Sequence, residues 1–389
     1  MKIKDGLVLL LLRALYGLKQ SPALWQKHLS TTLQNLGLTE VPEAPCLFTN
    51  EHLVLFFFVD DIVVIYHKDQ TAHVDELQRK LFEIYEMRYL GEIQWFLAIR
   101  IIRNRNERKL WLCQDSYISK LTAKFNVKED SKRSVPLPPD EPITQNPEQA
   151  TEQDIYVYQQ KVGSINYAAV HTRPDIAHAA SRLSEHLQNP SAQHLHLAQR
   201  VLEYLSNTRN YALTFSGFTQ STKDLFIASS DASLASDIDT RKSIQCFLFR
   251  LFGGAIDWKA AKQRTVTTSS TEAELLALSA TAKETIWWEN LFKAIYFSTG
   301  HQTKIQCDNT QTIRLLDKET YRLITKLRHV QIHSHWLRQE VQEGNISISW
   351  TPTAETIADG LTKPLNKQKH QYFLQQIGLE DITTKLQDN

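Results

Sequence analysis

Apolar residues recur along the first 113 positions at two spacings, which predict helices alternating with strands. Ser21-Pro22 has the form of a helix start, with serine as N-cap and proline at the first helical position. Leucines then follow at helical spacing. Two apolar runs, 53–59 and 62–66, flank two acidic residues and predict a β-hairpin. The other elements expected here are a buried strand over 7–12, a helix over 71–88, and strands over 91–102 and 109–113.

The pattern changes twice further along the chain. Residues 136–150 carry five prolines and no large aromatic side chain, which indicates a linker. Residues 151–209 predict three successive helices. Residues 210–389 predict a mixed sheet flanked by helices, with strands at 225–230, 304–307 and 346–350, a hairpin over 243–259, and helices near 270–295, 310–317, 325–343 and 353–363. We therefore expect an α+β or α/β chain in four parts: 1–135, 136–150, 151–209 and 210–389.

Composition excludes several classes of protein. With 389 residues, 22% charged residues and a formal net charge of +1, the chain is long enough for two or three domains and has no overall basic field. Its 8 Trp, 13 Tyr and 16 Phe exclude a disordered chain. Its 4 cysteines are widely spaced, so we expect neither a disulfide framework nor a zinc site. Every apolar run is too short to span a bilayer, and the N-terminal run lacks a cleavage site, which favours a cytoplasmic or nuclear protein.

Two adjacent acids, Asp60 and Asp61, lie between the two strands of the first predicted hairpin. Repulsion and desolvation both penalise such a pair unless a cation compensates. A hairpin tip that presents carboxylates can hold Mg²⁺ through oxygen ligands. The alternative is an exposed turn, because aspartate suits turns. The local sequence alone leaves both interpretations open.

Four separated acids in the last part form a second pattern. Asp231 and Asp308 each follow a predicted strand. Glu274 and Asp359 each lie in a predicted helix. Neighbouring strand ends would bring the first two together, and helices packed over that end would add the others. Such a cluster requires divalent metal, and two ions about 4 Å apart would activate water and stabilise the leaving oxygen in phosphodiester cleavage. Any one of these acids alone is more often a surface charge or a cap, so the hypothesis depends on the joint pattern.

The local sequence favours Glu274 over Glu272 as the helical ligand. Residues 269–272, Ser-Ser-Thr-Glu, have the form of a capping box in which Glu272 reaches back to the backbone N–H of Ser269. That gives Glu272 a structural role. Glu274 lies close to the buried edge of the helix without an evident partner, so we assign it to the metal.

Basic residues and histidines mark two further candidate surfaces. Lys259, Lys262 and Arg264 precede a run of hydroxyl side chains and a helix start, where cations and backbone N–H groups suit phosphates. A solvated loop is the alternative. His329 and His333 have a spacing that can chelate metal, but no third ligand follows as in known zinc motifs. Contacts with nucleic acid, or plain surface histidines, are therefore favoured over zinc.

Taken together, these motifs resemble the C-terminal part of copia-type LTR-retrotransposon polyproteins. The strings that match in order and spacing cover nearly the whole chain: ALYGLKQSP at 14–22, FVDD at 58–61, LGEIQWFLAIRI at 90–101, YQQKVGSINY at 158–167, RPD at 173–175, DAS at 231–233, TVTTSSTEAEL at 265–275, CDN at 307–309 and IADGLTKPL at 357–365.

The resemblance implies a reverse-transcriptase palm and thumb over 1–135, a helical connection over 151–209 and a ribonuclease H-like domain over 210–389. In such a palm, Asp60 and Asp61 would bind the metals of nucleotidyl transfer. Lys19 and Gln20 would line the site for template and incoming nucleotide.

The same resemblance implies a role for the second group of acids. Ribonuclease H folds use four acids in the order strand-Asp, helix-Glu, strand-Asp and helix-Asp, which is the order of Asp231, Glu274, Asp308 and Asp359. The implied cofactor is Mg²⁺ or Mn²⁺, with two ions per active site. The implied partners are an RNA–DNA hybrid and a template-primer, with no membrane.

The polymerase part departs from the family pattern. The family's polymerase uses a third carboxylate well upstream of the ALYGLKQ string, and Asp5 lies too close to that string to serve. The finger subdomain is missing as well. We therefore expect an incomplete polymerase region that is inactive alone. In the other part, Cys246 replaces a glycine that is common in the family, without touching a ligand.

Three hypotheses of function follow. The first is metal-dependent hydrolysis of RNA in RNA–DNA hybrids by the C-terminal domain, with the basic residues before the helix holding the strand. The second is RNA-directed DNA polymerase activity completed by a second polymerase chain. The third is a non-catalytic remnant that only binds nucleic acid or a partner.

Overall fold

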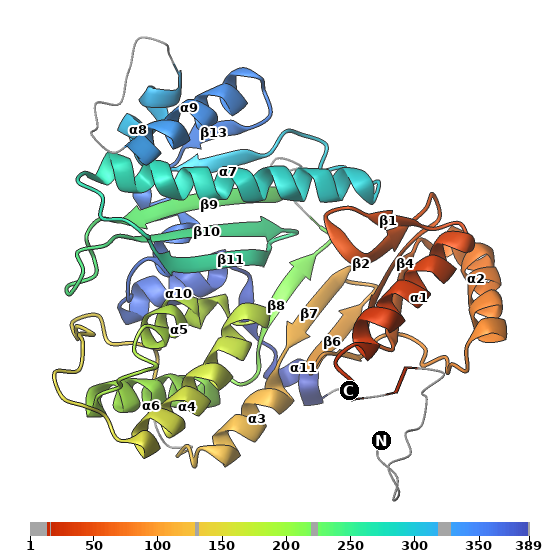
Figure 1. Ribbon diagram of the computed structural model, residues 1–389, viewed down its shortest axis with the longest axis horizontal. Coiled ribbons are helices and arrows are strands. Elements are labelled where there is room, and N and C mark those ends of the chain that lie inside the picture. The colour runs from red at the N-terminus through yellow and green to blue at the C-terminus, as the bar shows by residue number, and fades with distance from the viewer. Residues whose placement is uncertain (1–13, 16, 129–131, 219–224, 318–327, 388–389) are drawn as a thin grey trace, which may run out of the picture. The chain divides into compact units, whose positions relative to one another are not determined.

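The computed structural model describes residues 14–15, 17–128, 132–218, 225–317 and 328–387 (Figure 1). The chain divides into a first unit, Met1–Ile93 with Trp287–Ser298, and a second unit, Gln94–Ile286 with Thr299–Asn389. The strand predicted over 7–12 lies outside the described residues. Among the residues that are described, no helix combines the length and the apolar character needed to cross a bilayer.

The first unit packs two helices against an antiparallel sheet. Its strands adjoin in chain order: β1 (Thr39–Val41), β2 (Ala44–Thr49), β3 (Leu53–Phe58) and β4 (Asp61–Tyr66). Helices α1 (Ser21–Asn35) and α2 (Thr71–Ile84) bury leucines against the sheet, among them Leu29, Leu33 and Leu77. The predicted hairpin is confirmed, with its tip at Val59 and Asp60.

Two boundaries in this unit differ from the prediction. The N-cap of α1 is Gln20, and the hydroxyl of Ser21 donates instead to the carbonyl of Leu15 at 2.6 Å. Helix α2 ends four residues early because Tyr85 turns to extended backbone, with φ −125° and ψ 144°. Its ring packs edge-on against Trp25, with centroids 5.5 Å apart, and its hydroxyl bonds to Thr32. These tertiary contacts outweigh the local helical pattern.

The second unit contains the mixed sheet that the sequence predicts. Its strand order is β11-β10-β9-β12-β13. The first three strands are antiparallel neighbours, and β12 and β13 run parallel to β9. The strands are β9 (Phe226–Ser233), β10 (Ile244–Leu251), β11 (Gly254–Lys262), β12 (Lys304–Cys307) and β13 (Ser347–Trp350). The prediction of a mixed sheet flanked by helices is confirmed.

Helices cover this sheet and bring functional segments to it. Figure 1 shows α7 (Ser270–Ala294) running along the sheet, and the Gln263 side chain donates to the Ala273 carbonyl at 2.9 Å. Helices α8 (Thr310–Asp317) and α9 (Arg328–Gln342) follow β12 in the chain. The 3-10 turn η5 (Ile357–Leu361) and α10 (Lys367–Gln376) form a common apolar cluster with side chains from β10. That cluster fixes the segment around Asp359 against the sheet.

A second antiparallel sheet joins segments from both sides of the helical block. Its order is β14-β8-β7-β6-β5. The strands are β5 (Trp95–Phe96), β6 (Ile99–Asn104), β7 (Lys109–Cys113), β8 (Tyr211–Ser216) and β14 (Leu379–Asp381). The pairing of β7 with β8 and of β8 with β14 was not predicted, because these segments are far apart in the chain.

The three helices predicted over 151–209 are present as α4 (Glu152–His171), η2 (Pro174–Ile176) with α5 (Ala177–Ser184), and α6 (Ala192–Asn207). Helix α3 (Asp115–Lys124), which was not predicted, packs into the same core and completes the helical block. Helix α11 (Thr383–Gln387) ends the described chain. The proline-rich stretch 136–150 lacks helix and strand, as a linker would. It is nevertheless bound to this block: Leu137 and Ile143 are buried in the core, and the Thr144 carbonyl bonds to His194 at 2.9 Å.

A buried ion pair lies at the turn between α4 and α5. Arg173 and Asp175 have side chains that are 0% exposed, and two hydrogen bonds of 2.9 and 2.7 Å join them. The Tyr204 hydroxyl donates to the same carboxylate at 2.6 Å. Burial alone would raise the pKa of Asp175, but the guanidinium and the Tyr204 hydroxyl hold it below its usual value. The charge is therefore retained inside the core.

We expect Arg173→Met to lower the free energy of unfolding by about 3–5 kcal/mol, because it leaves a buried carboxylate without its countercharge. Tyr204→Phe removes one hydrogen bond to that carboxylate and should cost about 1–2 kcal/mol. Urea denaturation of the full chain, followed by tryptophan fluorescence, measures both. Equal stability of Arg173→Met and wild type would show that the pair contributes nothing.

Candidate active site

Asp231 and Asp308 meet where β9 and β12 run parallel. The strands pair Gln306 with Ser229, so two residues further along this register Asp308 comes opposite Asp231. Asp231 lies within β9, and Asp308 directly follows β12. The strand topology thus brings these two acids close together, as the sequence pattern predicted.

Helix α7 and turn η5 add the other two acids. Ligand atoms of Glu274, Cys307 and Asp308 all lie within 4.8 Å of one another. Glu274 also accepts a hydrogen bond from the backbone N–H of Ala232, the residue after Asp231. Asp359, in η5, is close enough for its charge to raise the pKa of both Asp231 and Glu274. The structure therefore brings the four predicted acids together.

Each aspartate of this carboxylate cluster (Asp231, Glu274, Asp308 and Asp359) has its own donor. Thr362 donates its hydroxyl to Asp231 Oδ2 at 2.7 Å, and Thr353 donates to Asp308 Oδ2 at 2.7 Å. The Lys363 ammonium lies 2.5 Å from Asp359 Oδ1. These three donors were not predicted from the sequence. A spacing of four residues between Asp359 and Lys363 was the available signal for one of them.

Glu274 is the most strongly perturbed member of the cluster. It is only 5% exposed, and its Oε2 atom is buried without a hydrogen-bond partner. Burial, followed by the charges of Asp231 and Asp308, raises the pKa of Glu274 to about 9. Burial also raises the pKa of Asp231 to about 6, an effect that the Thr362 hydrogen bond opposes and Asp359 and Asp308 reinforce.

These residues fit a divalent cation with oxygen ligands. The unpartnered Oε2 of Glu274 is a buried acceptor without a donor, and the surrounding carboxylates are the ligands that Mg²⁺ prefers. Cys307 is a neighbour that the sequence analysis did not anticipate. Burial raises the pKa of its thiol to about 12, and Mg²⁺ prefers oxygen ligands to sulfur, so the carboxylates are the expected ligands.

Glu272 has the structural role that the sequence predicted. Its backbone N–H donates to the Ser269 hydroxyl at 3.2 Å. Its carboxylate accepts from both the backbone N–H and the hydroxyl of Thr268, each at 2.8 Å. The carboxylate thus reaches one residue further back than expected. This assignment leaves Glu274 as the acid of α7 that enters the cluster.

The acids of the first unit have a different environment. Asp60 and Asp61 are both exposed at the tip of the β3–β4 hairpin, and no three-ligand group includes them among the described residues. Lys19 and Gln20 are exposed just before α1. The structure thus places Asp60 in an exposed turn and Asp61 at the exposed start of β4. Their polymerase role and that of the two residues before α1 stay predictions.

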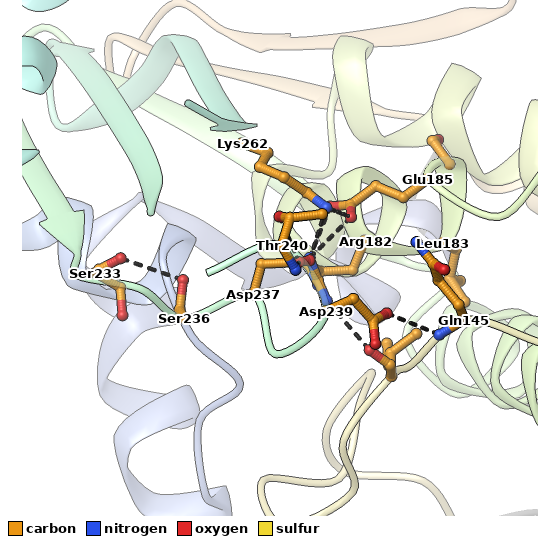
Figure 2. A network of polar contacts seen from close by, with 12 residues as sticks. Gln145, Arg182, Leu183, Glu185, Ser233, Ser236, Asp237, Asp239, Thr240 and Lys262 are labelled. Atoms are coloured by element: carbon orange, nitrogen blue, oxygen red, sulfur yellow. Dashed lines mark hydrogen bonds and ion pairs between the residues drawn. The ribbon is translucent and has the colours of Figure 1, made fainter. Parts of the chain in front are cut away.

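Of the three cations expected to contact nucleic acid, Lys262 forms ion pairs with acids of the protein itself. Figure 2 shows its ammonium pointing at Asp237, 2.7 Å away, and at Glu185. Arg182 donates to the same Asp237 oxygen at 2.7 Å. Burial would raise the pKa of Asp237, but these donors hold it well below its usual range. Lys262 therefore forms ion pairs within the protein, and its predicted contact with nucleic acid stays a prediction.

The other predicted surface residues remain candidates for contact with nucleic acid. Lys259 and Arg264 are exposed. His329 bonds to the Thr265 hydroxyl at 3.1 Å, and His333 bonds to the Ser279 hydroxyl at 2.7 Å. Over the described part of the chain, no histidine belongs to a group of metal ligands.

Comparison with known proteins adds independent information. A family model described as reverse transcriptase (RNA-dependent DNA polymerase) matches residues 2–139. The chain is 32% identical over 388 residues to the retrovirus-related Pol polyprotein from transposon TNT 1-94 of Nicotiana tabacum, covering 97% of this chain and 28% of that protein. It is 30% identical over 282 residues to a putative transposon Ty5-1 protein of Saccharomyces cerevisiae, covering 69% of this chain and 87% of that protein.

The chain belongs to the copia-type retrotransposon Pol family. A second plant relative, the Pol polyprotein from transposon RE1 of Arabidopsis thaliana, is 30% identical over 389 residues and is covered over 26% of its length. This copia-type chain thus spans about a quarter of the plant polyproteins it matches. A solved foamy viral protease-reverse transcriptase in complex with RNA/DNA hybrid aligns with 88% of this chain and 39% of that chain, at TM-score 0.43 and 15% identity.

The raised pKa of Glu274 predicts how pH affects the metal-free copia-type chain. Between its ordinary pKa of 4.5 and its folded pKa of about 9, Glu274 keeps a proton in the folded state that the unfolded state releases. Stability should therefore fall as pH rises through this range. Glu274→Gln removes this contribution and should flatten the slope.

The measurement is the melting temperature across pH 5–9 in a metal chelator, for wild type and Glu274→Gln. Parallel pH profiles of the two proteins would contradict the prediction. Glu272→Gln is the matched control, since its carboxylate caps the same helix outside the cluster.

Proposed function

We propose that the C-terminal part of this chain hydrolyses RNA in RNA–DNA hybrids with two divalent metal ions. The observation that carries the proposal is Glu274, whose buried oxygen has no partner, beside Asp308 and close enough to Asp231 and Asp359 for their charges to raise its pKa. Buried like charges are costly, and a divalent cation is the partner that resolves this cost. Phosphodiester hydrolysis is the reaction that such sites perform.

Individual residues of the chain would have separate roles in this hydrolysis. When bound, Mg²⁺ or Mn²⁺ supplies an activated water and stabilises the charge of the leaving oxygen. The four acids would hold the ions, and Glu274 would then be ionised, because a nearby positive charge lowers its pKa. The hydroxyls of Thr362 and Thr353 orient two of the carboxylates. Lys259 and Arg264 would hold phosphates of the strand.

The family supports the choice of a hybrid as substrate. The matching family model is that of an RNA-dependent DNA polymerase. Synthesis of DNA on an RNA template leaves an RNA–DNA hybrid. A nuclease for this hybrid on the same chain would remove the copied RNA.

Cleavage of a labelled RNA–DNA hybrid in Mg²⁺ tests the proposal. Asp231→Asn, Asp308→Asn and Glu274→Gln should each lower the rate at least about a hundredfold, since they remove metal ligands. Glu272→Gln should retain most of the wild-type rate. Equal losses in the Glu272 and Glu274 variants, or the absence of cleavage by the wild type, would contradict it and favour a non-catalytic remnant.

The match of residues 2–139 to the reverse transcriptase family supports a second candidate. This candidate is RNA-directed DNA synthesis completed by a partner polymerase chain, with Asp60 and Asp61 as metal ligands. We expect primer extension when a longer relative is added, and its loss in Asp60→Asn. Hybrid cleavage should be unaffected by that substitution. Failure to extend a primer with the partner present would remove this candidate.

A further inference from the structure

We propose that Lys363 is the counter-ion of the carboxylate cluster. Its ammonium group pairs with the Asp359 carboxylate in the metal-free protein and must move away from that carboxylate when a divalent ion binds. The inference rests on the proposed function, because it concerns the same cluster. It assigns to Lys363 control over metal affinity, in addition to any effect on fold stability.

The geometry of the donors singles out Lys363. Asp231 and Asp308 are each held by a threonine hydroxyl, which orients a carboxylate but leaves its charge in place. Lys363 brings a full positive charge to within 2.5 Å of Asp359 Oδ1. Its charge also interacts with Asp231 and Asp308. The metal-free cluster is thus partly neutralised by a side chain of its own segment.

The same ion pair stands in the way of a metal. A cation that binds Asp359 needs the carboxylate oxygens, and two positive charges on one carboxylate repel each other strongly at such short range. The ammonium must therefore move before the metal gains its full interaction. The cost of breaking the pair is subtracted from the metal's binding free energy.

Lys363 is placed so that it can move without disturbing the cluster. Its side chain is 46% exposed, whereas that of Asp359 is 21% exposed. The backbone on either side is anchored, because Thr362 is 2% exposed and Leu365 is 8% exposed. Only the flexible lysine stem has to rotate toward solvent, and the ammonium is then hydrated. A metal ion can thus displace the Lys363 ammonium, yet the ammonium lies close enough to Asp359 to oppose metal binding.

Mn²⁺ titration of the metal-free full chain by calorimetry tests the inference. Lys363→Met should bind Mn²⁺ roughly threefold to tenfold more tightly than wild type, as expected when a competing, partly exposed ion pair is removed. It should also melt at a lower temperature in chelator, because the carboxylates lose their counter-ion. Lys363→Arg keeps the charge and should stay close to wild type in both measurements. Lys367→Met, an exposed lysine at the start of α10, is the matched control and should leave both unchanged.

The outcomes separate this inference from the proposed function. Unchanged or weaker Mn²⁺ binding by Lys363→Met, with normal binding by wild type, would overturn the counter-ion role and leave the metal centre standing. No Mn²⁺ binding by the wild type would overturn both. If Lys363→Met and Lys367→Met both bind Mn²⁺ more tightly, the cause is the lower net charge of the protein. That result would also overturn the specific role of Lys363. Circular dichroism of each variant verifies that it is folded.

Discussion

Repulsion between carboxylates gathered in a poorly hydrated place is the constraint on which the site depends. Parallel strands β9 and β12 bring Asp231 and Asp308 opposite each other, and α7 adds an acid that is almost fully buried. The metal-free chain tolerates this by three means: a proton on Glu274, hydroxyl donors on two aspartates, and an ammonium on Asp359. A divalent ion can replace the first and the third together.

The surrounding fold is arranged to hold this unfavourable group in place. The segment that carries Asp359 packs through Ile357, Ala358 and Leu361 into a cluster shared with the sheet and α10. Gly360 is required there, since a Cβ atom would lie 2.5 Å from the Phe373 ring. Buried polar pairs elsewhere in the unit, around Asp175 and Asp237, join elements that are distant in the chain. They connect these elements to one another within the second unit.

The sequence predicted the elements with a regular hydrophobic period and the residues with a purely local role. The three helices of the central block and the hairpins follow from periodicity, and the assignment of Glu274 over Glu272 follows from capping chemistry. The end of α2 at Ile84 and the commitment of Lys262 to Asp237 could not be predicted in this way. Both depend on side chains that only the tertiary structure brings near, Trp25 in one case and Arg182 in the other.

Burial, more than the number of acids, distinguishes the two acidic motifs of this chain. Asp60 and Asp61 are adjacent in sequence, yet at an exposed hairpin tip water screens their repulsion and no cation is needed to keep them there. Asp231 and Glu274 are far apart in sequence, yet the fold forces them into one desolvated place. A chain gains nothing in stability from that arrangement. The second unit therefore has more to gain from a bound cation than the hairpin of the first unit, because burial makes like charges costly.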